Sequence, residues 1–165
     1  VFKLAMNYAN EFAKGKNIKI EVKGKNVLKK HQDGIFSPKM RLADYKLYTI
    51  LSHLMQNAAK YSPDGSSVKV KFGEQAVEGK KFLTISVRDE GIGIPKEEQE
   101  KVLQGNRASN AIASGISGSG YGLGRARSII EHFQGKGKII EINSPLNPDA
   151  KNPGTEIIAY LKLKD

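Results

Sequence analysis

The sequence predicts an α+β fold, a two-layer α/β sandwich in which three main helices back a mixed, mostly antiparallel five-stranded sheet. Two observations carry this expectation. Apolar residues recur at helical spacing in three separate segments, and short segments of alternating apolar and polar residues lie between them. The length of 165 residues without an internal repeat is typical of one domain, so we expect a single domain over residues 1–165.

The first half of the chain contains two of the predicted helices. Apolar residues at helical spacing indicate an amphipathic helix over residues 1–14. The same spacing recurs over residues 47–58, where we expect Asp44 to cap the helix. Between these helices, the alternating residues 18–22 predict a strand, and residues 34–38 are a candidate for a further short strand.

The second half alternates strands and helices around a polar loop. Residues 104–120 are rich in Gly, Ser, Asn and Ala and indicate a mobile loop, whereas Gly135 ends the last helix. A turn near Glu78-Gly79 is expected to join two neighbouring strands. The expected elements are, in order, a turn at 62–65, strands at 68–72 and 82–87, a short helix from 95, a helix at 122–133 and strands at 138–142 and 156–163.

Composition excludes several classes of protein. No apolar run approaches the ~18 residues that a membrane span needs, and no signal peptide is recognisable. The chain has no cysteine, which excludes disulfides, thiol nucleophiles and cysteine-based zinc sites. We therefore expect a cytoplasmic domain without direct membrane contact, whose parent protein can still be anchored in a membrane.

The first motif that could bind a ligand lies on the second predicted helix. Asn57, Lys60 and Tyr61 share one helix face with His53, which is one turn earlier. An amide oxygen suits Mg²⁺, which prefers hard oxygen donors, and Lys60 can neutralise phosphate charge. The alternative interpretation is an ordinary amphipathic helix with a polar outer stripe.

The second motif begins with Asp89 at the end of a predicted strand and continues through Gly91 and Gly93. A carboxylate at a strand end can accept a hydrogen bond from an exocyclic amine such as N6 of adenine. The glycines let a base approach the backbone closely, and Ile94 supplies an apolar wall. The alternative is a simple exit from a strand into a turn.

The third motif is the glycine series Gly118, Gly120 and Gly122 ahead of the third helix. Exposed N–H groups and a helix N-terminus favour phosphate. A dinucleotide-binding loop would follow the first strand of a βαβ unit, and a Walker loop would continue with Gly-Lys-Ser/Thr, so neither is present. The alternative is a flexible linker with a helix start. Together, the three motifs describe an ATP pocket.

The net charge of +10 has three interpretations. The lysines form a solvated surface, or their field attracts polyanionic ATP or an acidic partner, or they bind nucleic acid. Lysines are spread over residues 14–30, 69–81 and 136–138 without interleaved aromatic residues or a recognisable reading helix. We therefore expect no nucleic-acid partner.

The ordered motifs resemble those of a known family. The segments 57–61 (NAAKY), 89–95 (DEGIGIP) and 118–124 (GSGYGLG) are similar to the motifs of the catalytic, ATP-binding domain of two-component sensor histidine kinases. That domain belongs to the wider superfamily with the Bergerat ATP-binding fold. The resemblance covers roughly the whole chain.

The resemblance implies roles for individual residues. Asn57 would ligate an Mg²⁺ ion that bridges the phosphates, and Asp89 would read adenine N6. Lys60 and Arg107 are the candidate phosphate stabilisers, and Thr155 would help to hold adenine through water. A flexible ATP lid is expected at about residues 104–121. The complete implied nucleotide-binding set is Asn57, Lys60, Tyr61, Asp89, Gly91, Gly93, Ile94, Arg107, Gly118, Gly120, Tyr121, Gly122, Leu123 and Thr155.

Two segments depart from the family's pattern. His53 stands where the family commonly has a second asparagine and where related ATPases of the chaperone, gyrase and mismatch-repair type have a water-activating glutamate. We therefore expect phosphoryl transfer rather than efficient ATP hydrolysis. The family's phenylalanine box is replaced by Lys101–Asn106, and only Arg107 after it matches the pattern.

The resemblance implies a protein histidine kinase fragment, unable to autophosphorylate alone, that binds Mg-ATP and donates the γ-phosphoryl group in two-component signalling. His31, His53 and His132 lack the sequence context of the acceptor histidine, so we expect that acceptor on a dimerisation helix upstream of Val1. The expected partners are these dimerisation and histidine-phosphotransfer helices of the parent kinase and, indirectly, a response regulator. Two alternatives stay open: an anti-sigma-type serine kinase on the same fold, and a nucleotide-binding pseudokinase or interaction module.

Overall fold

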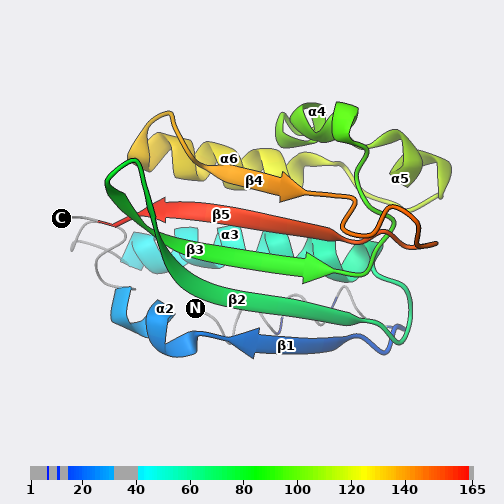
Figure 1. The fold of residues 1–165 in the computed structure, drawn as a ribbon, viewed down its shortest axis with the longest axis horizontal. Helices are drawn as coiled ribbons and strands as arrows, with labels where there is room; N and C mark the ends of the chain where they lie inside the picture. Colours follow the sequence, from blue (N-terminus) through cyan, green and yellow to red (C-terminus); the bar gives the residue numbers. More distant parts are fainter. Residues whose placement is uncertain (1–6, 8–10, 12–14, 32–40, 164–165) are drawn as a thin grey trace.

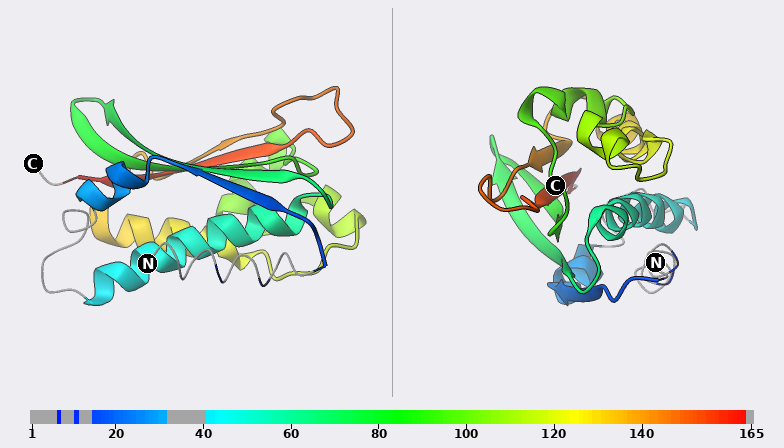
Figure 2. Two further views of the ribbon diagram at one scale, coloured as in Figure 1. Left: turned by 90° about the horizontal axis from the view of Figure 1, so that it is seen from below. Right: turned by 90° about the vertical axis from the view of Figure 1, so that its right-hand side faces the viewer.

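A five-stranded sheet forms one layer of the structure, and the long helices pack on one of its faces (Figure 2). The computed structural model describes residues 7, 11, 15–31 and 41–163, with the backbone alone for 41–44. The predicted two-layer α+β sandwich is confirmed. The strand proposed at 34–38 and most of the helix proposed at 1–14 lie outside the described residues.

The sheet has the strand order β1-β2-β3-β5-β4 (Figure 1). The first pair, β1 with β2, is parallel, and the other three pairs are antiparallel, so the sheet is mixed and mostly antiparallel as predicted. Each of the strands predicted outside residues 34–38 is present, and the one expected at 68–72 extends further. The strands are β1 (Lys19–Lys23), β2 (Ser67–Val77), β3 (Lys80–Asp89), β4 (Ile140–Asn143) and β5 (Thr155–Lys162).

The turn between β2 and β3 lies where the sequence predicts it. Glu78 and Gly79 both have positive φ, 49° and 73°. Two-residue hairpin turns with this backbone match the right-handed twist of the strands that they join. The hairpin fixes the register of β3, whose last residue is Asp89.

The described helices differ in length and in what they contact. The two long ones pack on the sheet, and the short ones lie in the connections between strands (Figure 1). They are α2 (Lys25–His31), α3 (Arg41–Tyr61), the 3₁₀ turn η1 (Lys96–Glu98), α4 (Gln99–Leu103), α5 (Ser109–Ala113) and α6 (Tyr121–Gln134). The short helix after Pro95 and the helix ended by Gly135 match the predictions.

Helix α3 supplies much of the hydrophobic core. Its apolar residues recur at helical spacing and are almost completely removed from solvent: Leu47, Ile50, Leu51, Leu54, Met55 and Ala58. The predicted cap at Asp44 is wrong, because the helix begins at Arg41 and Asp44 lies inside it. A carboxylate is favoured in the first helical turn as well as at the cap, so the residue type does not separate the two positions.

Helices α3 and α6 run side by side in opposite directions. Near the start of α3, the Lys46 ammonium lies 3.1 Å from the centre of the Phe133 ring at the end of α6. Near the end of α3, the side chains of His53 and Asn57 face Gly122 in the first turn of α6. The C-terminal end of α3 and the N-terminal end of α6 therefore meet at one edge of the sandwich.

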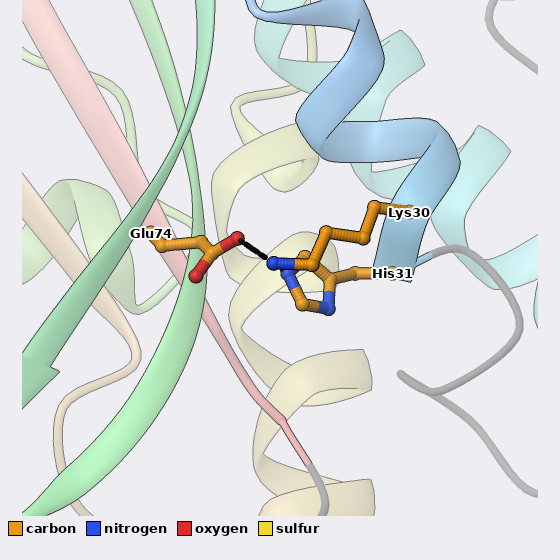
Figure 3. Close-up of polar contacts among 3 residues, drawn as sticks. All are labelled: Lys30, His31 and Glu74. Carbon is orange, nitrogen blue, oxygen red and sulfur yellow. Dashed lines mark hydrogen bonds and ion pairs between the residues drawn. The ribbon is translucent and has the colours of Figure 1, made fainter.

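Two features were not predicted from the sequence. Helix α2 follows β1 and is held against β2 by an ion-pair cluster, in which Lys30 Nζ and His31 Nε2 lie 3.1 Å and 2.6 Å from the Glu74 carboxylate (Figure 3). The segment 104–120, predicted as a loop, contains helix α5. The Glu98 carboxylate accepts a hydrogen bond of 2.7 Å from the Ser109 N–H at the start of α5, so a residue from another segment stabilises this short helix.

The C-terminal end of α3 is capped from a distant part of the chain. The Lys16 ammonium donates hydrogen bonds to the carbonyls of Lys60, at 2.8 Å, and Ser62, at 2.9 Å. A cation at this position also interacts favourably with the helix dipole. This contact fixes the last turn of α3, which carries Asn57, Lys60 and Tyr61. In the described part of the chain, no helix has both the length and the apolar character needed to cross a bilayer.

The capping contact gives a prediction for stability. Lys16→Met should lower the free energy of unfolding by about 1–2 kcal/mol, because the last carbonyls of α3 lose a charged donor. Urea denaturation measures the change. Lys71→Met, at an exposed position of β2, is the matched control and should change stability by less than about 0.5 kcal/mol. An equal loss in both variants would show that the contact does not stabilise the helix end.

Candidate functional site

A cavity of about 350 Å³ lies where the end of α3 meets the first turn of α6 and the adjoining ends of β3 and β5. Apolar side chains from the β3–η1 connection, α4, α5 and β5 line it together with polar and cationic ones. Of the nucleotide-binding residues that the resemblance implies, all but Gly91 line this cavity: Asn57, Lys60, Tyr61, Asp89, Gly93, Ile94, Arg107, Gly118, Gly120, Tyr121, Gly122, Leu123 and Thr155.

Asp89 is the last residue of β3 and pairs with Thr155, the first residue of β5. Its side chain is only 6% exposed. Burial raises the pKa of Asp89 from 3.8 to about 7, and the nearby Glu90 carboxylate adds to the increase. Backbone N–H groups of Gly91 and Thr155 hydrogen-bond the carboxylate and oppose this shift of the pKa. The cavity wall therefore carries a carboxyl group that changes its charge near neutral pH.

Gly91 lies directly behind this carboxyl group. Its N–H donates a hydrogen bond of 2.8 Å to Asp89 Oδ1. A Cβ atom at Gly91 would lie 2.7 Å from the Tyr61 carbonyl oxygen and 2.8 Å from Asp89 Oδ1, which is too close for any side chain. Glycine is therefore required for the turn to pack against the end of α3. Gly91 supports the cavity wall without lining the cavity.

A network around Ser144 joins the two loops on this side of the cavity. Ser144 Oγ accepts a hydrogen bond of 2.7 Å from the Ile94 N–H and donates one of 3.0 Å to the Gly154 carbonyl. It also lies 3.0 Å from Thr155 Oγ1. A backbone bond of 2.8 Å from Gly154 N to Gly91 O closes the arrangement. The loop after β3 and the loop before β5 are thus held as one unit around Asp89.

A second part of the lining is cationic. Lys60, Arg107 and Arg125 all line the cavity. Burial lowers the pKa of Lys60, and the positive charge of Arg107 lowers it further. The Lys60 ammonium lies against the bare backbone of Gly118, where a Cβ atom would come within 1.7 Å of Nζ. An anion bound here would offset both the cost of burying the Lys60 charge and the mutual repulsion of these cations.

Arg107 is held by the segment that follows it. Its guanidinium donates to the carbonyls of Ala111, at 3.4 Å, and Ile116, whereas Nε is buried without a hydrogen-bond partner among the described residues. The Arg107 side chain thereby holds the segment that runs from α5 toward the glycine series. Arg107 Cγ also packs against Gly120, where a Cβ atom would lie 2.7 Å away.

The side chains of His53 and Asn57, near the end of α3, face the first turn of α6. A Cβ atom at Gly122 would lie 3.4 Å from His53 Nδ1 and 3.6 Å from both amide atoms of Asn57. His53 Nδ1 is buried and has no hydrogen-bond partner among the described residues. Burial lowers the pKa of His53, and the positive charge of Arg125 lowers it further.

Two residues of this region were not identified from the sequence. Arg125 lies one turn after Gly122 on α6, and its helical spacing was a signal that could have placed it beside the glycine series. Ser144 lies in the polar connection between β4 and β5, and no local pattern marks it. Its role depends on contacts with Ile94 and Gly154, which only the folded chain brings together.

Comparison with known proteins gives a consistent family match. The family described as histidine kinase-, DNA gyrase B- and HSP90-like ATPase matches residues 42–165. The sensor histidine kinase WalK of Bacillus subtilis is 33% identical over 121 residues, which cover 67% of this chain and 20% of WalK. The sensor histidine kinase Hik2 of a Synechocystis species is 30% identical over 120 residues, covering 70% of this chain and 27% of Hik2. The chain therefore spans only about a quarter of the length of these curated relatives, or less.

Solved structures agree on the fold. The mycobacterial sensor histidine kinase MprB superimposes with a TM-score of 0.66 at 20% identity, covering 99% of this chain and 94% of that chain. A nucleotide-free catalytic domain of the histidine kinase ThkA gives a TM-score of 0.63 at 19% identity, with 99% and 94% covered. At this level of identity, the similarity establishes the shared fold.

The burial of Asp89 predicts a pH dependence of stability. Between about pH 4 and pH 7 the folded chain keeps a proton on Asp89 that the unfolded chain releases, so the free energy of unfolding should fall as pH rises. The slope from this group is at most about 1.4 kcal/mol per pH unit and levels off above about pH 7. In Asp89→Asn this contribution should vanish. Urea denaturation of both proteins across this range measures the difference.

The matched control is Asp149→Asn, at an exposed position of the connection between β4 and β5. Its pH profile should follow that of the unsubstituted chain. Parallel profiles for Asp89→Asn and the unsubstituted chain would show that Asp89 titrates in its ordinary range.

Proposed function

The chain belongs to the family of histidine kinase-, DNA gyrase B- and HSP90-like ATPases, and from this premise we propose that it binds Mg-ATP and donates the γ-phosphoryl group to a histidine on a dimerisation helix of a sensor kinase. The proposal assigns the chain to two-component signal transduction. The observation that carries it is the cavity itself, whose lining combines a buried hydrogen-bonding carboxyl group with cationic side chains and glycines.

Asp89 is proposed to recognise the adenine base. A carboxylate has about four lone-pair positions, and the N–H groups of Gly91 and Thr155 engage two of them. The remaining acceptors are available to the exocyclic amine of adenine. Ile94 and Leu123 also line the cavity and offer apolar contacts to the ring. A guanine base carries a carbonyl oxygen at the corresponding position and would face the carboxylate unfavourably.

The cationic side chains are proposed to hold the phosphates. Lys60, Arg107 and Arg125 surround a space that a triphosphate would neutralise. Phosphoryl transfer depends mainly on positioning and on stabilising charge, which these side chains supply. The backbone of the glycine series and the N-terminal turn of α6 add N–H donors for phosphate oxygens. Residues 104–121, which include Arg107 and α5, are the proposed lid.

The donor set fits a metal ion that enters with the nucleotide. Asn57 offers an amide oxygen at the cavity wall. In the part of the chain that the structure describes, no cluster of three or more His, Asp or Glu side chains could hold an ion by itself. Phosphate oxygens and water would complete the coordination, as Mg²⁺ prefers. When bound, Mg²⁺ neutralises phosphate charge and polarises the phosphoryl group.

The lining favours transfer over hydrolysis. Among the described residues that line the cavity, Asp89 is the only carboxylate, and it belongs to the proposed adenine side. A glutamate that would activate water is replaced by His53. The acceptor is proposed to be a histidine of a partner helix, because His31, His53 and His132 all lack the sequence context of the acceptor histidine. The dimerisation and phosphotransfer helices are the direct partners in this proposal, and a response regulator is an indirect one.

The adenine assignment predicts a change in affinity. Asp89→Asn should weaken ATP binding about ten- to hundredfold, because an amide NH₂ group would replace an acceptor opposite the adenine amine. Isothermal titration calorimetry with Mg-ATP measures the dissociation constant. Asp149→Asn, which is exposed and distant in sequence, should leave it unchanged. Unaltered affinity in Asp89→Asn would remove this residue from the base site.

The proposed reaction predicts an acid-labile product. The chain should transfer label from radioactive Mg-ATP to the separated dimerisation and phosphotransfer helices of WalK, a relative at 33% identity. The label should be lost in acid and retained in alkali, as expected for phosphohistidine, and an acceptor with its histidine replaced by glutamine should stay unlabelled. A label stable to acid would indicate an anti-sigma-type serine kinase. Nucleotide binding without any transfer would indicate an interaction module instead.

A further inference from the structure

We propose that His53 is a second metal-ligating side chain of this site, and that the site consequently prefers Mn²⁺ to Mg²⁺ as the ion that accompanies the nucleotide. The inference rests on the proposed nucleotide-binding function and specifies its metal. It concerns the position at which this chain departs from the pattern of the family it resembles.

The geometry brings two donor atoms to one place. His53 and Asn57 are one turn apart on the same face of α3, so their side chains are neighbours. The position that a Cβ atom would take at Gly122 is 3.4 Å from His53 Nδ1 and 3.6 Å from Asn57 Oδ1. Because Gly122 has no side chain, both donor atoms lie against its backbone, and all three residues line the cavity. To bind one ion, both side chains would turn toward the open cavity and bring these atoms to the ~2.1 Å of a bond between a divalent ion and an imidazole nitrogen.

The hydrogen bonding of the ring also fits a ligand better than a purely structural histidine. A structural buried histidine normally satisfies both ring nitrogens. Here Nδ1 is buried without a hydrogen-bond partner among the described residues. Histidine ligands commonly use one nitrogen for the metal and hold the other through a second residue. Gln56 lines the same cavity three residues further along α3 and would supply that second contact.

The donor types determine which ion is preferred. Asn57 and the phosphates supply oxygen atoms, which suit both Mg²⁺ and Mn²⁺. An imidazole nitrogen adds affinity for divalent transition metals, whereas Mg²⁺ takes oxygen ligands and keeps its waters. An asparagine in place of His53 would supply a further amide oxygen and would restore the preference for hard oxygen donors. The single residue at position 53 therefore sets the discrimination between the two ions.

The direct test is pulsed electron paramagnetic resonance of the chain with Mn²⁺ and ADP. A metal-bound imidazole produces a nitrogen hyperfine coupling on the Mn²⁺ signal. We expect this coupling in the unsubstituted chain and in the control His132→Asn, whose histidine is exposed on α6. It should be absent in His53→Asn. A coupling that is missing from the unsubstituted chain, or that persists in His53→Asn, overturns the proposal.

A second measurement follows the affinity. The dissociation constant of ADP should be lower with Mn²⁺ than with Mg²⁺, and His53→Asn should reduce this ratio on the order of tenfold. His132→Asn should leave the ratio unchanged. Equal ratios in all three proteins overturn the metal preference.

The two proposals fail in different ways. If ADP and Mn²⁺ bind together without a nitrogen coupling, His53 is not a ligand, and the nucleotide-binding function stands. If calorimetry detects no nucleotide with either metal ion, both proposals are wrong. Because nucleotide binding is measured separately from the coupling, the two failures are distinguishable.

Discussion

The pairing of Asp89 with Thr155 at the ends of β3 and β5 is the interaction on which the site depends. It brings the last residue of one strand and the first of another to the same edge of the sheet. The loops that continue from these residues, through Gly91 and Gly154, are then close enough to share a backbone hydrogen bond. Ser144, at the start of the loop before β5, adds a second link by accepting a hydrogen bond from Ile94 in the loop after β3. One ladder contact therefore positions the carboxyl group, its backbone donors and the adjacent apolar wall.

The cavity holds two ionisable side chains, Asp89 and Lys60, whose charged forms are both destabilised by their surroundings. Burial raises the pKa of Asp89 and lowers the pKa of Lys60, so in both cases removal from water opposes ionisation. A bound molecule with an amine at one end and phosphates at the other would compensate both groups. The electrostatic cost of burying these two groups and the selectivity for such a molecule thus have one origin. Arg107, held by carbonyls of the segment that follows it, has partners that a phosphate would replace.

Much of the fold was predictable because local patterns and tertiary structure agree. The periodic apolar face of α3 and the turn at Glu78-Gly79 are local signals, and both are found where expected. Helix α2 was missed because its seven residues contain only two apolar side chains, Val27 and Leu28, and its ion-pair cluster involves a distant strand. Helix α5 was missed because the carboxylate at its start comes from Glu98. The ordered motifs identified most of the residues around the cavity, whereas Ser144 required the folded chain.

The contact between Glu98 and the start of α5 has a consequence for how nucleotide affinity is distributed. Asn110 is likewise bonded to the carbonyls of Ile92 and Gly93, so the first part of the proposed lid is attached to the body of the domain. Fixing the backbone of one residue costs about 1–2 kcal/mol of conformational entropy. A lid that is ordered through α5 before binding confines that cost to the short glycine-containing stretch after Ala113. More of the free energy gained from phosphate contacts then remains as affinity, because closure of the proposed lid would order only that short stretch.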